Sequence, residues 1–106
     1  MTTFKHINID ETQVLLAQSK AVIVDIRDAA SFNLSHIEGA TLISNENVQD
    51  FIREADLDEK LIVYCYHGNS SQGAAQFFTE QGFDEVYSMD GGFEAWRQQY
   101  PTSEAG

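Results

Sequence analysis

The sequence is poor in cysteine and in positive charge. It holds one cysteine among 106 residues, which excludes an internal disulfide and a Cys-rich zinc site. Six Lys and Arg residues stand against 17 Asp and Glu residues, and the formal net charge is −11. Such a field repels nucleic acid phosphates and anionic lipids, so we expect neither nucleic acid nor a membrane as a partner.

Long apolar stretches are also missing. The segment 1–6 has no apolar core of the kind found in a signal peptide. The longest apolar runs are too short to span a bilayer. We therefore expect a cytoplasmic protein, in a reducing setting that leaves a free thiol intact. The length fits a single domain over residues 1–106, with 102–106 as a loose tail.

Short apolar runs alternate with amphipathic segments along the chain. Near-continuous apolar runs predict buried strands at 21–24, 41–43 and 61–64, with further candidates at 85–88 and 5–7. Apolar residues at steps of three and four predict helices at 12–18, 48–55, 70–81 and 93–100. This alternation predicts an α/β fold, with a central, mostly parallel sheet of about five strands and helices on both faces.

The single cysteine, Cys65, directly follows the predicted strand 61–64. In parallel sheets, ligands bind beyond the carboxyl ends of the strands. A polar loop containing Gly68 comes next, and Ser70 or Ser71 can cap the following helix. Such a loop turns backbone N–H groups and the positive end of a helix toward the sulfur, which lowers the pKa of a thiol. A lone cysteine is commonly a small buried apolar side chain, but that role requires no glycine turn and no capped helix. We therefore interpret Cys65 as a nucleophile.

Two chemistries use a thiolate in such a loop, phosphate transfer and sulfur transfer. A cysteine phosphatase needs an arginine six positions after the nucleophile to clamp the phosphate oxygens. Ser71 occupies that position, and the segment 61–90 contains no Lys or Arg. The pattern therefore favours transfer of a single sulfur atom.

The loop 65–70 resembles the active-site loop of the rhodaneses, the thiosulfate sulfurtransferase family. Three further segments, 24–28, 36–40 and 91–96, are similar to segments of the same family in order and spacing. The resemblance implies an enzyme of rhodanese-like fold that works by double displacement. Its cysteine takes sulfur from thiosulfate as a persulfide and passes it to a thiophilic acceptor, either cyanide or a dithiol such as thioredoxin.

The same resemblance implies roles for particular residues. Cys65 inherits the role of catalytic nucleophile. The backbone amides of the loop inherit substrate binding, at Tyr66, His67, Gly68, Asn69 and Ser70. It implies a small-molecule donor and acceptor, no metal and no cofactor, and we expect a monomer or a weak dimer. Two alternatives remain open, a persulfide carrier in a protein sulfur relay and a non-catalytic regulatory module.

Several other residues allow two interpretations. Arg27 either pairs with Asp25 or Asp28, which we favour, or binds the anionic donor. His67 acts as a base or only shapes the loop, and Ser70 bonds the persulfide or only caps the helix. Simple structural roles are expected elsewhere: a hydrogen-bonded turn at His36, a turn at Gly91–Gly92, and core packing for Phe93, Trp96 and Tyr100.

Overall fold

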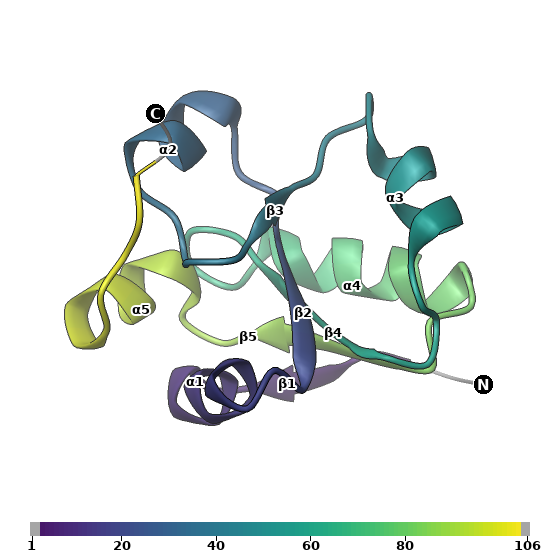
Figure 1. The fold of residues 1–106 in the computed structure, drawn as a ribbon, viewed down its shortest axis with the longest axis horizontal. Helices are drawn as coiled ribbons and strands as arrows, with labels where there is room; N and C mark the ends of the chain where they lie inside the picture. The colour runs from purple at the N-terminus through teal and green to yellow at the C-terminus, as the bar shows by residue number, and fades with distance from the viewer. Residues whose placement is uncertain (1–2, 105–106) are drawn as a thin grey trace.

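The computed structural model describes residues 3–104, which build a five-stranded sheet with helices around it (Figure 1). The strands are β1 (Lys5–Ile7), β2 (Ala21–Asp25), β3 (Thr41–Leu42), β4 (Lys60–Tyr64) and β5 (Glu85–Met89). Their order in the sheet is β1-β5-β4-β2-β3, and the neighbouring strands pair in parallel. The expected α/β fold with a parallel sheet is confirmed. The carboxyl ends of β4 and β2 lie side by side, because Asp25 pairs with Tyr64.

The helices are α1 (Ile9–Ala17), α2 (Ala29–Leu34), α3 (Val48–Glu54), α4 (Ser70–Glu80) and α5 (Gly92–Gln99). Apolar periodicity predicted four of them, although α1 begins at Ile9 rather than at Thr12. The side chain of Asn8 sets that start, since it accepts a hydrogen bond from the N–H of Glu11. Helix α2 was not predicted. It has six residues and buries none of them, so it has no apolar stripe.

Two apolar layers cover the faces of the sheet, and the side chains of β4 alternate between them. Leu61 and Val63 point toward α3 and α4, where they pack with Ala75 and Phe78. The other layer lies toward α1 and α5, which lie side by side (Figure 1), and contains Ile62, Tyr64, Met89, Phe93 and Trp96. The expected core positions of Phe93 and Trp96 are confirmed, and Tyr100 packs against the same cluster. Both faces of β4, the strand that ends directly before Cys65, are therefore covered.

The last described residues contact the segment before β3. Ser103 pairs with His36 in an antiparallel bridge, with N–H to carbonyl distances of 2.8 Å in both directions. The ring of His36 also donates from Nδ1 to the carbonyl of Phe32, as expected for a residue that fixes a turn. The expected loose tail is therefore paired at Ser103, and residues 105–106 of it lie outside the described residues.

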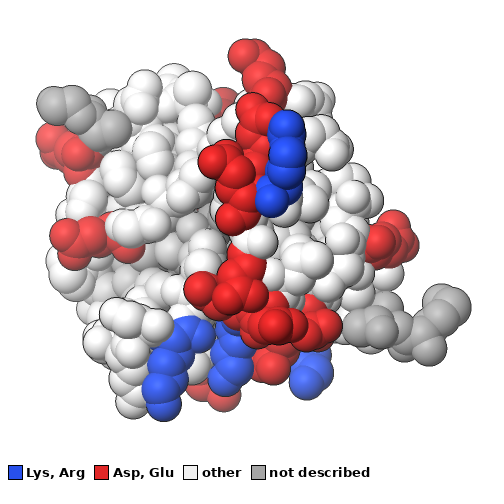
Figure 2. Space-filling view, turned by 45° about the vertical axis from the view of Figure 1, so that its right-hand side comes forward, with Lys and Arg blue, Asp and Glu red and all other residues white. Residues whose placement is uncertain are grey.

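Acidic side chains form a band on the face shown in Figure 2. Three of the acidic residues, Asp56, Asp58 and Asp84, lie in the segments that lead into β4 and β5. These two segments are in contact, since the N–H of Asp84 donates to the carbonyl of Leu57. There, hydrogen bonding to Asp84 and repulsion from Asp84 and Asp56 raise the pKa of Asp58. These residues precede β4 and β5, so they lie at the opposite edge of the sheet from Cys65. Within residues 3–104, no helix combines the length and apolarity that a membrane crossing requires.

Candidate active site around Cys65

The sulfur of Cys65 lies inside a ring of hydrogen-bond donors. Its Sγ accepts from the backbone N–H of Gly68 at 3.2 Å and from that of Ser71 at 3.3 Å. The hydroxyl of Ser71 is also 3.3 Å from Sγ. Cys65 is 6% exposed, so these donors face little competition from water. The loop therefore holds the sulfur in the N–H cradle that a thiolate needs.

Two opposing effects set the acidity of Cys65. Burial by itself raises the pKa of the thiol. Hydrogen bonds from the Ser71 hydroxyl and from the backbone N–H groups of Ser71, Gly68 and His67 outweigh burial, and the pKa is lowered overall. The nucleophilic thiolate is consequently populated at a lower pH than in an ordinary cysteine.

Gly68 shapes the turn that closes this ring. Its φ of 91° lies in the left-handed region, which side chains rarely tolerate. A Cβ built there would also lie 3.1 Å from the backbone nitrogen of Gly91 and 3.3 Å from the carbonyl oxygen of Met89. Both observations show why glycine occupies this position.

The first turn of α5 donates two backbone hydrogen bonds to the Cys65 loop. The N–H of Phe93 donates to the carbonyl of Cys65 at 2.8 Å, and the N–H of Glu94 donates to that of Tyr66 at 3.0 Å. With the carbonyls bound to α5, the loop N–H groups are free to face the sulfur. Gly91, at φ 78°, is the N-cap of α5, which agrees with a turn role for Gly91–Gly92. This backbone support was not predicted from the sequence, where the Gly91–Gly92 pair was the available signal.

A hollow of about 220 Å³ opens beside the thiol. The predicted site residues that line it are Arg27, Cys65, Tyr66, His67, Asn69 and Ser70. Gly68 contributes through its N–H to Sγ. A larger hollow of about 610 Å³ adjoins it and shares Ile26, Arg27 and Asp28. The structure thus brings all the predicted site residues to one edge of the sheet.

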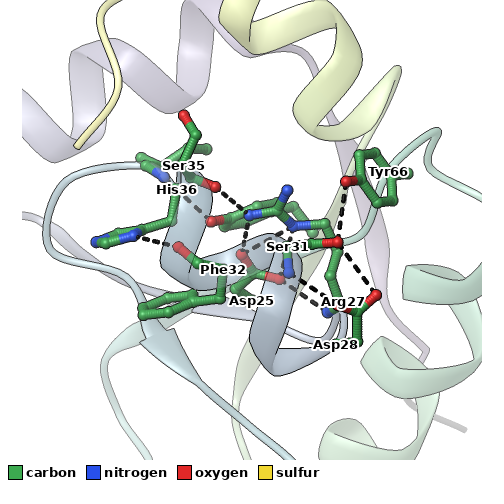
Figure 3. A network of polar contacts seen from close by, with 10 residues as sticks. Asp25, Arg27, Asp28, Ser31, Phe32, Ser35, His36 and Tyr66 are labelled. Atoms are coloured by element: carbon green, nitrogen blue, oxygen red, sulfur yellow. Dashed lines mark hydrogen bonds and ion pairs between the residues drawn. The ribbon is translucent and has the colours of Figure 1, made fainter. Parts of the chain in front are cut away.

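Arg27 is committed to a buried ion pair (Figure 3). Its Nε and Nη2 donate to the carboxylate of Asp25, and Nη2 also donates to the carbonyl of Ser35 at 2.7 Å. The side chains of Arg27 and Asp25 are 2% and 0% exposed. Asp28 instead caps α2 by accepting from the N–H of Ser31. Of the two ion pairs expected for Arg27, the structure contains the one with Asp25.

Aromatic rings cover the Arg27 guanidinium. Its carbon lies 4.0 Å from the ring centre of Phe93 and 5.0 Å from that of Tyr66. The hydroxyl of Tyr66 donates to Ser31 Oγ at 3.0 Å (Figure 3), and Tyr66 also lines the hollow beside the thiol. Tyr66 therefore links the Cys65 loop to the start of α2.

The hydroxyl that contacts the sulfur belongs to Ser71, whereas Ser70 is exposed at the start of α4. From the sequence, Ser71 was considered as a possible helix cap and as the position where a phosphatase has its arginine, but not as a partner of the sulfur. The serine pattern of an N-terminal helical turn was the available signal, but it does not show which hydroxyl faces inward.

Fold and site together define a sulfurtransferase-type domain, and comparison with known proteins agrees. The Rhodanese-like domain family matches residues 8–99, and the chain belongs to this family. Among solved structures, a rhodanese-like domain protein from Staphylococcus aureus superimposes with a TM-score of 0.82 at 26% identity, covering 97% of this chain and 100% of that one.

Curated relatives match over nearly the whole chain. The thiosulfate sulfurtransferase GlpE of Pseudomonas fluorescens Pf-5 is 52% identical over 105 residues, which are 99% of this chain and 95% of that protein. The protein of the same name from Shewanella oneidensis is 54% identical over 99 residues, with 92% and 97% covered.

Proposed function

We propose that this protein is a thiosulfate sulfurtransferase that carries sulfur as a persulfide on Cys65. The observation that carries the proposal is the position of its single thiol, with Sγ accepting from Gly68 and Ser71 at the carboxyl end of β4. The names of the relatives described above support thiosulfate as the donor.

In the loading step, the Cys65 thiolate attacks the outer sulfur of thiosulfate. A new S–S bond forms to Sγ, the S–S bond of thiosulfate breaks, and sulfite leaves with the electron pair. The product is a persulfide whose negative charge lies on the outer sulfur. We infer that N–H groups of the loop stabilise this charge, because the loop that holds Sγ also lines the hollow beside it.

In the discharge step, an acceptor attacks the outer sulfur and the Cys65 thiolate leaves. Cyanide becomes thiocyanate in this step. A dithiol such as thioredoxin would take the sulfur as its own persulfide, which its second thiol then resolves to a disulfide with release of hydrosulfide. Cytoplasmic location forms part of this proposal, since a reducing compartment keeps Cys65 a thiol.

We assign donor binding to the backbone amides of the loop, from Tyr66, His67, Gly68, Asn69 and Ser70. The hollow beside Cys65 supports this, since four of these residues line it. The pairing of Arg27 with Asp25 and Ser35 supports a structural role for this cation rather than direct donor binding.

Thiocyanate formation from thiosulfate and cyanide tests the proposal. The wild type should turn over, and Cys65→Ser should not, because a hydroxyl is neither soft nor ionised at neutral pH. Arg53→Met, which changes an exposed side chain, serves as the control and should keep full activity. An aryl phosphate should give no turnover, because Ser71 stands where a phosphate clamp requires arginine. Retention of sulfur transfer by Cys65→Ser would show that the nucleophile lies elsewhere.

A further inference from the structure

A chain of two buried hydroxyls ends at the sulfur of Cys65. Ser71 Oγ lies 3.3 Å from Sγ, and Ser88 Oγ lies 2.8 Å from Ser71 Oγ. Ser71 and Ser88 are both 0% exposed. They come from different elements, the first turn of α4 and the end of β5. The family comparison assigns no role to either side chain.

The chemistry of a thiolate sets the direction of these hydrogen bonds. A thiolate has no proton, so the Ser71 hydroxyl must donate to it. The oxygen of Ser71 is then the acceptor for the hydroxyl of Ser88. Both protons therefore point toward the sulfur, and each bond polarises the next in a dry interior.

We propose that Ser71, oriented by Ser88, makes Cys65 a better leaving group, so that this pair serves discharge of the persulfide more than its loading. The inference rests on the proposed sulfur transfer. In the persulfide, the negative charge lies on the outer sulfur and Sγ is neutral. When the acceptor attacks, the S–S bond breaks and the electron pair returns to Sγ, where the Ser71 proton stabilises it.

The two steps respond differently to a more stable thiolate. A leaving thiolate departs faster as its pKa falls, whereas an attacking thiolate loses intrinsic nucleophilicity as its pKa falls. Above the pKa, where the thiol is already ionised, the hydroxyl chain therefore brings no gain to loading. Its benefit lies in discharge.

The charged and titratable groups around the same hollow are few. Arg27 and Asp28 come from the connection after β2, and Tyr66 and His67 come from the loop itself. Substitution of Ser71 or Ser88 leaves all four in place. A change in the pKa of Cys65 between wild type and these variants therefore reports the hydroxyls.

The first arm of the test measures the pKa of Cys65 from the pH dependence of alkylation by iodoacetamide. Ser71→Ala should raise it by about one unit, the effect of losing one hydrogen bond to a charged group. Ser88→Ala should raise it by less. In the double variant, loss of Ser88 should add nothing, because Ser88 acts only through Ser71. Thr79→Val is the matched control, since it removes a buried hydroxyl of α4 that bonds the carbonyl of Ala75, and it should leave this pKa unchanged.

The second arm measures each half-reaction in single turnovers, above the pKa of every variant. Ser71→Ala should slow discharge by cyanide about threefold to tenfold while loading by thiosulfate stays equal or becomes faster. Equal slowing of both steps, or no change in the pKa of Cys65, would overturn the proposal. Should Ser71→Ala fold poorly, Ser88→Ala carries the same test with Ser71 in place. If the wild type fails to load from thiosulfate, the proposed function is wrong. The alkylation measurement still shows whether the hydroxyls of Ser71 and Ser88 lower the pKa of Cys65.

Discussion

Gly92 lies directly against the backbone carbonyl of Tyr66. A Cβ built on Gly92 would lie 2.5 Å from both the carbon and the oxygen of that group, and 2.6 Å from the carbonyl oxygen of Cys65. Gly92 also has a φ of 60°. This contact lets the N–H groups of Phe93 and Glu94 reach the loop carbonyls, and so connects the start of α5 to the thiol cradle.

Replacement of Gly92 should disturb both stability and chemistry. Gly92→Ala places a methyl group against the backbone carbonyl of Tyr66, at a residue with a left-handed φ. It should lower the free energy of unfolding by at least about 2 kcal/mol. Urea denaturation measures this loss, and thiocyanate formation should fall with it. Gly73→Ala is the control, because a Cβ there meets nothing within 4 Å and alanine favours a helix by about 0.5–1 kcal/mol. Wild-type stability in Gly92→Ala would contradict the close contact.

Removal of Arg27 should act on stability rather than on donor binding. Arg27→Met leaves the Asp25 carboxylate buried without its cation, and a broken buried ion pair costs about 3–5 kcal/mol. The KM for thiosulfate of the folded variant should stay within about twofold of wild type. Arg53→Met, from the exposed pair with Asp50, should change stability by about 0.5 kcal/mol or less. A large rise in KM with unchanged Tm would make Arg27 the cation that binds the donor.

The sequence was informative where local patterns decide the structure. The apolar run ending at Tyr64 and the glycine turn placed Cys65 correctly at the carboxyl end of β4. The expected cap by Ser70 or Ser71 is wrong, because Asn69 is the N-cap of α4 and its side chain makes no capping hydrogen bond. Helix α2 was not predicted because it buries no residue and so has no hydrophobic stripe. Its start is instead set by the side chain of Asp28, which accepts a hydrogen bond from the N–H of Ser31.

The hydroxyl chain could not be predicted, because it depends on the pairing of distant segments. Ser88 reaches Ser71 since β5 pairs with β4 in the register that sets Ser88 beside Val63. A slip by one residue would turn Ser88 to the opposite face of the sheet. Neither this register nor the rotation of α4 about its axis can be read from a single sequence.

The donor should bind weakly. Thiosulfate is a dianion, the net charge is −11, and Arg27 is paired with Asp25. Backbone amides then supply most of the binding, which predicts a roughly millimolar KM, corresponding to about −4 kcal/mol. Steady-state kinetics with varied thiosulfate measures it. A micromolar KM would require a strong anion site that the loop amides do not explain.

Stability should depend on pH through Cys65. Burial raises the pKa of this thiol, but the Ser71 and loop hydrogen bonds lower it overall in the folded state. Between the folded pKa and the unfolded value of about 8.5, the unfolded chain binds the proton and the folded chain does not. The contribution of Cys65 is therefore complete above the unfolded pKa and is lost as the pH falls through the folded pKa.

Urea denaturation across this pH range, with wild type compared to Cys65→Ser, isolates that contribution because the other groups cancel. The stability of the wild type relative to the variant should increase as the pH rises. A difference that stays constant, or that shrinks with rising pH, would contradict the lowered pKa.

The intact mass of the protein tests persulfide formation on Cys65 most directly. Treatment with thiosulfate should add the mass of one sulfur atom, and cyanide added afterwards should restore the original mass with release of thiocyanate. Cys65→Ser should show no adduct under the same conditions. An unchanged wild-type mass after thiosulfate, or an equal adduct on Cys65→Ser, would contradict the account.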